Sequence, residues 1–166
     1  MVSTQEQVIY FAGLFDGEGS VGIWKQSKSP RTYILRAAIG NTNPKPLQIA
    51  RAIWGGSIGF QDKGVKNKPL YHWQLQGAMA CKFLKDMFPF LIIKSAVAAE
   101  GIFFYENKRD LSGNQYCRPN KRVVKGDIFV MEDELRFRES CRKRVQALNK
   151  KGRIVTEAEK IIETKN

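Results

Sequence analysis

Two acidic residues near the amino terminus, Asp16 and Glu18, are the first side chains whose type and spacing could support chemistry. They alternate with Gly17 and Gly19 and follow a run of apolar and small residues. If that run is a helix, both acids stand at its carboxyl end, where the helix dipole disfavours a carboxylate by about 0.3–1 kcal/mol. A core helix with a glycine cap would leave these acids unexplained. We therefore predict that they hold a cation.

The residues before the acids predict the helix that must position them. Ser3 with Glu6, and Thr4 with Gln7, form two overlapping capping boxes ahead of an apolar run. The helix should therefore begin near residue 5.

One face of this helix is made of small residues. Ile9, Ala12, Gly13, Asp16 and Gly17 recur at helical spacing, and large apolar side chains occupy the neighbouring face. A glycine inside a helix costs about 1 kcal/mol, which close packing against another backbone can offset. We predict that a partner helix packs on this face.

The bulk composition points to a polyanionic partner. The chain has 166 residues, 43% of them hydrophobic, and a formal net charge of +12, which suits one core domain with a basic surface that binds nucleic acid or an acidic membrane. The three cysteines, Cys81, Cys117 and Cys141, are widely spaced, so a disulfide framework or zinc site is not expected. No apolar run has the length of a membrane span, and we expect a soluble, intracellular protein.

Hairpins alternate with helices over the first hundred residues. Strands are expected over 20–26, 32–41, 57–61 and 70–76, and further helices over 44–54, 78–87 and 95–107. This order predicts an α+β domain over 1–107, with one antiparallel sheet covered by helices on a single face. A basic, charged extension over 108–166 should contain a loop and an accessory helix over 127–147.

The uncovered face of that sheet is the expected nucleic-acid surface. Basic and amide side chains on strands can hydrogen-bond to base edges, although each alone is an ordinary solvated strand residue. The candidates are Trp24, Gln26, Lys28, Arg36, Gln61, His72, Gln74 and Gln76.

A basic cluster in the accessory helix allows two interpretations. It could contact phosphates, or it could be a solvated face balanced by nearby acids. Its members are Arg136, Arg138, Arg142, Lys143 and Arg144.

Four segments resemble one known family. The stretch 11–19 resembles the signature of the LAGLIDADG homing endonucleases, and the segments 39–43, 54–58 and 89–94 look like later landmarks of that family in the same order. The resemblance covers roughly residues 8–105. It implies an αββαββα fold with a saddle-shaped sheet, and a homodimer formed through the signature helices. The chain shows one signature. The stretch most like a second one, Ala99-Glu100-Gly101, lacks the preceding helix pattern and the Gly-acid-Gly form.

The resemblance also implies roles for individual residues. Glu18 and the Gly17 carbonyl match the ligands of a divalent cation, Mg²⁺ or Mn²⁺, although the family position is more often Asp. Lys94 matches a lysine that stabilises charge or activates water. Asn43 matches a polar residue that orders solvent, and this role competes with its expected role as a helix N-cap. Asp16 should support the helix end.

One family feature is missing from the sequence. The family often has a further basic residue just inside the next helix, where this chain has Leu47 and Gln48. Lys45 and Arg51 are weak substitutes, so the second charged helper stays unassigned.

The resemblance implies an intron-encoded, site-specific endonuclease that cuts both strands of DNA. A homodimer would recognise a long pseudo-palindromic site with half-sites roughly 10 bp apart and leave short staggered 3′ ends. An organellar location would follow by family analogy, with no membrane partner and no small-molecule cofactor. Two alternatives share the fold, a maturase-like RNA-binding splicing factor and a catalytically inactive DNA-binding regulator. The presence of both Glu18 and Lys94 disfavours the regulator.

Overall fold

The computed structural model describes residues 4–26, 32–62 and 68–108, together with a helix over 125–151 whose side chains are described from 132 to 150. The elements follow the predicted order of hairpins and helices. They are α1 (Gln5–Glu18), β1 (Gly19–Lys25), β2 (Tyr33–Asn41), α2 (Pro44–Trp54), β3 (Ser57–Gln61), β4 (Leu70–Gln76), α3 (Gly77–Met87), the short 3-10 helix η1 (Phe88–Phe90), α4 (Ser95–Asn107) and α5 (Lys125–Lys151). The α+β fold class and the αββαββα order are confirmed.

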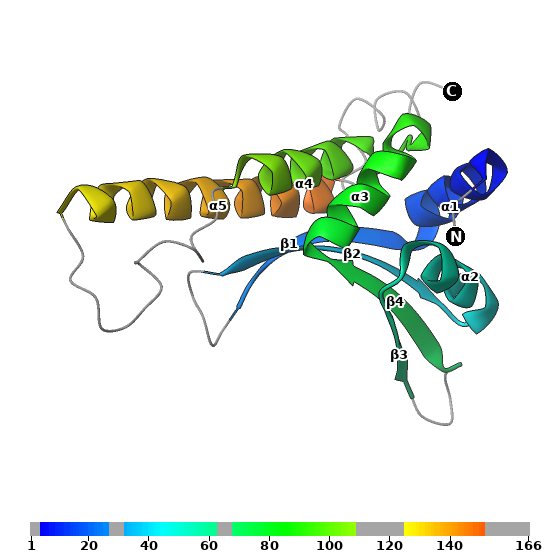
Figure 1. The fold of residues 1–166 in the computed structure, drawn as a ribbon. Helices are drawn as coiled ribbons and strands as arrows, with labels where there is room; N and C mark the ends of the chain where they lie inside the picture. Colours follow the sequence, from blue (N-terminus) through cyan, green and yellow to red (C-terminus); the bar gives the residue numbers. More distant parts are fainter. Residues whose placement is uncertain (1–3, 27–31, 63–67, 109–124, 152–166) are drawn as a thin grey trace, which may run out of the picture.

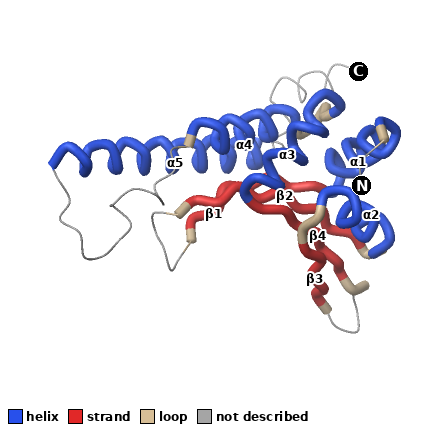
Figure 2. The backbone as a smooth tube through the Cα atoms, viewed as in Figure 1, coloured by secondary structure: helices blue, strands red, loops and turns tan. Residues whose placement is uncertain are grey.

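The four strands form one antiparallel sheet in the order β1-β2-β4-β3 (Figure 2). Each hairpin pairs its own strands, and the two hairpins join where β2 pairs with β4. The register places Gly19 opposite Ile39, so the end of α1 lies beside the end of β2. Arg36 lies between Gly22 on β1 and Gln76 on β4.

The sheet has one covered face and one open face. Along β2, Tyr33, Leu35, Ala37 and Ile39 are buried and the residues between them are only partly buried, which is the alternation typical of a strand with one covered face. Figure 1 shows the helices gathered on one side of the sheet, which curves beneath them. The opposite side carries no helix among the described residues.

Aromatic side chains form the centre of the core. Trp54 packs edge to face against both Phe11 and Phe83, with ring centroids 5.2 Å apart in each pair. The indole N–H of Trp54 donates to Asp86 over 3.0 Å, and that of Trp73 donates to the Gly55 carbonyl over 2.8 Å. These bonds satisfy polar atoms inside the packing between α2, α3 and the sheet.

The turn from α2 into β3 requires glycine. Gly55 and Gly56 have φ values of 76° and 87°, which disfavour residues with a side chain. A Cβ at Gly56 would also lie 2.5 Å from the Gln74 carbonyl oxygen. The backbone of this turn can therefore pack directly against β4.

Helix α5 packs along α4 and the edge strand β1 (Figure 1). Cys141 and Val145 are buried in the same core as the sheet residues. The Asn149 side-chain amide donates to the Val21 carbonyl over 2.9 Å. This contact covers part of an edge that could otherwise pair with another strand.

The arginines of α5 are largely paired with acids, which supports the balanced interpretation of the basic cluster. Arg138 and Glu134 form a buried pair at 2.6 Å, and Arg144 reaches Glu100 on α4 at 2.7 Å. Arg136 lies 3.6 Å from Glu132. Lys143 is exposed. No helix in the described part of the chain is long and apolar enough to cross a membrane.

A hydrogen-bond network ties α5 to β2. The Tyr33 hydroxyl donates to Glu139 over 2.7 Å, and Arg142 donates to Glu139 over 2.8 Å. The Arg142 bond, opposed by burial and aided by Tyr33, lowers the pKa of Glu139 to about 2. Burial and the Glu139 carboxylate raise the pKa of Tyr33 to about 12.

We expect Glu139→Gln to destabilise the protein by about 1–2 kcal/mol at pH 7, less than the full shift implies because the site is partly solvated. The folded pKa lies below the unfolded value, so the Glu139 contribution is present above about pH 4.5 and is lost as the pH falls towards about 2. Denaturant unfolding between pH 7 and pH 3 should show the two proteins converging. Glu132→Gln, at an exposed pair on the same helix, is the control; an equal loss in both variants would contradict the assignment.

Candidate active site

The carboxyl end of α1 is held against the segment that follows η1. The Asp16 carboxylate accepts hydrogen bonds from the backbone N–H groups of Ile92, Ile93 and Lys94 at 2.8, 3.2 and 2.9 Å. These contacts join positions more than seventy residues apart in the chain. Asp16 therefore supports the helix end, as predicted from the sequence.

The hydrogen bonds to Asp16 keep it ionised. Burial alone would raise the pKa of this carboxyl, but the three backbone donors and the nearby Lys94 ammonium outweigh it and hold the pKa below its usual value. The charged form is thus the one that the segment 92–94 recognises.

Lys94 immediately precedes α4, and its side chain reaches the carboxyl end of α1. Its ammonium donates to the backbone carbonyl of Asp16. Desolvation lowers the pKa of Lys94, against the opposing pull of the Asp16 and Glu18 charges. The structure thus brings Lys94 into the electrostatic range of Glu18, and its catalytic role stays a prediction.

Glu18 differs from Asp16 because it is exposed and makes no hydrogen bond or ion pair within the described residues. Gly17 is exposed too, and a Cβ placed on it would meet nothing within 4 Å. The backbone and carboxylate at this end are thus accessible from outside. The described residues hold no group of three or more His, Cys, Asp or Glu side chains suited to a metal ion.

Asn43 caps helix α2. Its side-chain oxygen accepts the Lys45 N–H at 3.0 Å, while its own N–H donates to Asn41 at 2.8 Å. The pairing of Gly19 with Ile39 puts this cap at the same end of the sheet as Glu18. The N-cap role is confirmed, and the solvent-ordering role stays a prediction.

The small-residue face of α1 is uncovered at both glycines. A Cβ added at Gly13 or Gly17 would meet nothing within 4 Å, and Ile9 and Tyr10 are 48% and 56% exposed. Ala12, another member of the predicted interface, is 1% exposed and lies in the core of its own chain. Asp16 is engaged by the segment 92–94, which leaves Ile9, Gly13 and Gly17 of the predicted set on the open side.

The predicted DNA-contacting residues share the open face of the sheet, apart from one that lies outside the described part. Strand register and alternation put Trp24, Arg36, His72, Gln74 and Gln76 on that face. Gln61 on β3 and Gln26 after β1 follow the same alternation, and both are exposed. Lys28 lies outside the described residues.

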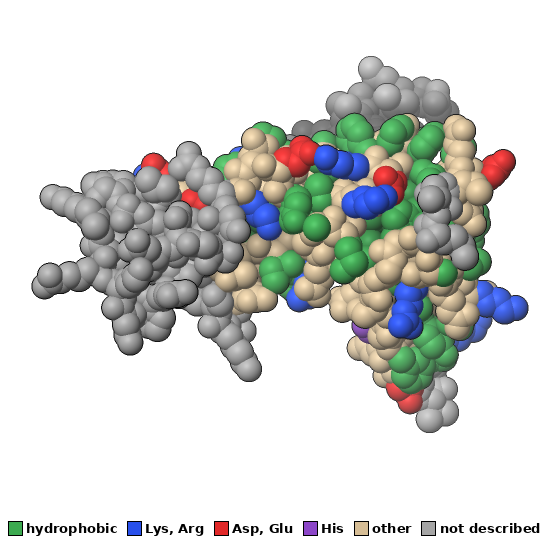
Figure 3. Space-filling model, in the orientation of Figure 1, with side chains coloured by type: hydrophobic (Ala, Val, Ile, Leu, Met, Phe, Trp, Pro, Cys, Tyr) green, Lys and Arg blue, Asp and Glu red, His purple; other side chains and the backbone are tan. Residues whose placement is uncertain are grey.

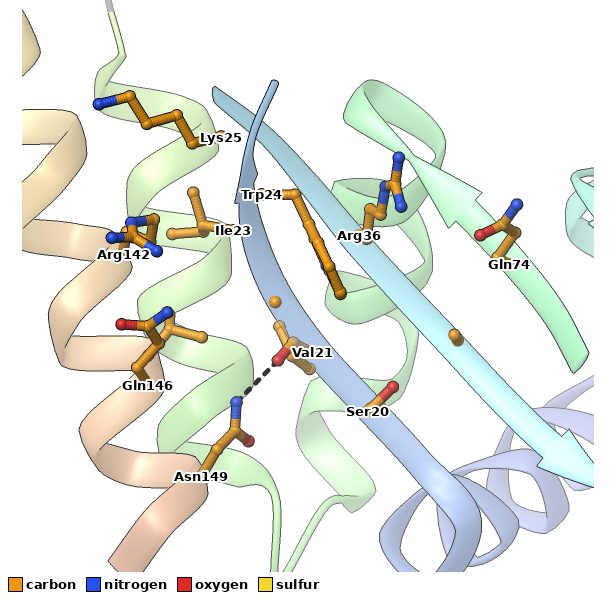
Figure 4. A pocket seen from close by; sticks show the side chains of 13 residues that line it. Ser20, Val21, Ile23, Trp24, Lys25, Arg36, Gln74, Arg142, Gln146 and Asn149 are labelled. Atoms are coloured by element: carbon orange, nitrogen blue, oxygen red, sulfur yellow. Dashed lines mark hydrogen bonds between the residues drawn. The ribbon is translucent and has the colours of Figure 1, made fainter. Parts of the chain in front are cut away.

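A hollow of about 460 Å³ lies beside β1, between the open face and α5 (Figure 4). Trp24, Arg36 and Gln74 line it from the sheet, and Arg142 and Gln146 line it from α5. The sequence did not single out Gln146 or Asn149, although their spacing from Arg142 places all three on one side of a helix. In the space-filling view Lys and Arg side chains are spread over the visible face and do not form one patch (Figure 3).

Solved structures identify this architecture. Homing endonuclease I-CvuI in complex with a DNA target in the presence of magnesium matches with a TM-score of 0.53 at 16% identity, covering 79% of this chain and 95% of that one. The chain has the homing endonuclease fold. A second I-CvuI complex, with its own target and calcium, gives 0.53 at 16% identity, covering 87% and 96% of the two chains.

The homing endonuclease fold recurs in an archaeal match. The intron-encoded homing endonuclease I-Vdi141I, complexed with DNA, has a TM-score of 0.50 at 14% identity, covering 87% of this chain and 97% of that one. The sequence matches no protein-family model and no curated protein. At 14% to 16% identity, these solved structures show the shared fold.

We expect the two acids of α1 to differ in their effect on stability. Asp16→Ala leaves three backbone N–H groups without their acceptor and should cost about 1–3 kcal/mol of unfolding free energy. Glu18→Ala, only two residues away, should change it by less than about 0.5 kcal/mol. Denaturant unfolding at pH 7 measures both. Equal losses would show that Asp16 is not the anchor of the segment 92–94.

Proposed function

We propose that this protein is a divalent-metal-dependent, site-specific endonuclease that cuts both strands of duplex DNA as a homodimer. The observation that carries the proposal is the placement of an exposed Glu18, with no partner among the described residues, and of Lys94 at the same end of α1, beside an open sheet face. The electrostatic influence of Glu18 on Lys94 supports their joint action. The fold shared with DNA-bound homing endonucleases supports the substrate class.

The donors at this site fit a hard divalent cation. The Glu18 carboxylate and the Gly17 carbonyl are both oxygen ligands, and both are exposed. Magnesium or manganese bound there would stabilise the charge of a phosphodiester and activate water. Glu18 and Gly17 would hold the ion, and Asn43 would order solvent near it.

Lys94 would stabilise the charge that develops at the phosphate or activate the attacking water. Its ammonium is held at the Asp16 carbonyl, so its position depends on the same helix end that carries Glu18. Burial lowers its pKa and so makes proton release easier than from a solvated lysine. Asp16 contributes by fixing the backbone that leads into Lys94.

A second copy of the chain would complete the assembly. The open side of α1 at Gly13 and Gly17 allows two copies of this helix to approach closely. Such packing would bring two Glu18 side chains near the dimer axis, one for each strand. Two sheets would then bind one long, pseudo-palindromic site, and two offset cuts would leave short 3′ ends.

We expect Glu18→Gln to abolish cleavage of duplex DNA and to leave binding of the same DNA largely intact. The amide keeps the size of the side chain but removes the charge that holds a cation. Cleavage and gel-shift assays with magnesium, on sites selected from a randomised duplex library, measure the two activities. Glu6→Gln, at the other end of α1, is the matched control. Robust DNA cleavage by Glu18→Gln would contradict the role of Glu18 as a metal ligand. A preference for RNA duplexes or loops would instead favour the maturase-like RNA-binding function.

We expect Gly13→Leu to block dimerisation without unfolding the chain. The added side chain meets no atom of its own chain near the Cβ position, but it would fill the space that a second α1 requires. Sedimentation velocity, alone and with DNA, should show a monomer with reduced double-strand cleavage. Ala99→Leu, on the exposed side of α4, should remain dimeric. If the Gly13→Leu protein stayed dimeric, the dimer interface would have to lie outside this face of α1.

A further inference from the structure

Arg36 is the one cation that the described strands place in the middle of the open sheet face. It sits on β2 with Gly22 opposite on one side and Gln76 opposite on the other. The described residues that alternate onto this face include no acid, so its charge is not neutralised by a neighbour on the sheet. Arg36 also forms no ion pair within the described chain.

The side chain of Arg36 is held by an aromatic ring. Its guanidinium carbon lies 5.2 Å from the centroid of the Trp24 ring, within the range of a cation–π contact. A Cβ at Gly22 would lie 2.8 Å from the Trp24 indole nitrogen, so the ring folds over the space that this glycine leaves empty. Figure 4 shows the indole on β1 beside Arg36 on β2.

The inner part of the guanidinium is desolvated and unsatisfied. The Arg36 Nε atom is buried and has no hydrogen-bond partner. Trp24, by contrast, is 57% exposed. Leaving a buried donor unpaired is unfavourable in the free protein. The exposed Trp24 ring is the part of this pair that an outside group can cover.

The chemistry of this pair suits a guanine base. The planar guanidinium can donate two parallel hydrogen bonds to O6 and N7 of guanine in the major groove. A stacked arginine is already oriented, so less side-chain freedom is lost on binding. The hollow beside Trp24 and Arg36 gives a base edge access to both residues.

We propose that Arg36, oriented by Trp24, reads one guanine in each half-site of the DNA target. Arg36 is three residues along β2 from Ile39, the partner of Gly19, which is about 10 Å at the rise of a strand. The guanine would therefore lie a few base pairs from the bond that is cut. The inference rests on the proposed function and gives it a base-specific contact.

The test is a comparison of base preferences in full-length protein. Wild type and variants bind a randomised duplex library with calcium in place of magnesium, and the bound DNA is sequenced. We expect wild type to prefer guanine at one position in each half-site. Arg36→Gln should reduce that preference tenfold to a hundredfold and leave the other positions unchanged. Trp24→Ala should weaken the preference at the same position.

Two control variants separate base-specific recognition by Arg36 from non-specific electrostatic attraction to DNA. Arg36→Lys keeps the charge but loses the planar fork, so the guanine preference should fall while the salt dependence of binding stays the same. Lys82→Gln removes one charge from the helical side, where Lys82 pairs with Asp86, and should leave the base profile unchanged.

The outcomes that overturn the inference are distinct. Equal weakening of all sequences by Arg36→Gln would assign Arg36 to a phosphate, and an unaltered profile would remove it from readout. Enrichment of duplexes by wild type in either case would leave the proposed function standing. A wild-type protein that enriches no duplex would overturn the proposed function, and this inference with it.

Discussion

The contact between the Asp16 carboxylate and the backbone of residues 92–94 is the constraint on which the candidate site depends. It fixes the carboxyl end of α1 to the segment that carries Lys94, with three N–H donors on one side chain. The Lys94 ammonium in turn donates a hydrogen bond to the Asp16 backbone carbonyl, so contacts in both directions join α1 to this segment. Glu18 can then remain exposed without loosening the helix end.

The two acids of α1 therefore differ in their surroundings because they lie on different sides of the helix. Asp16 faces the protein, where the hydrogen bonds it accepts hold its pKa low against the effect of burial. Glu18 faces solvent and has no partner among the described residues. A carboxylate that stabilises structure and one that is free to bind a ligand thus stand two residues apart, a pattern that fits a functional site.

The open face of the sheet depends on how the rest of the chain covers the other face and the β1 edge. The aromatic packing around Trp54 and Phe83 holds the helices on one side. Helix α5 closes part of the edge through Asn149 and is tied to β2 through Glu139. Among the described strand residues, the remaining surface carries Arg36, His72 and several amides and no acid, a charge pattern that suits a polyanion.

The sequence by itself determined the elements, because their signals are local. The capping box at Thr4, the alternation along β2 and the cap at Asn43 each act within a few residues. It also singled out Asp16, Glu18 and Lys94, although their roles came from a family resemblance. The tertiary structure alone decided that β2 pairs with β4, that Ala12 is buried, and that Asp16 binds the segment 92–94. Those outcomes depend on contacts between distant parts of the chain, which helical spacing and strand alternation do not encode.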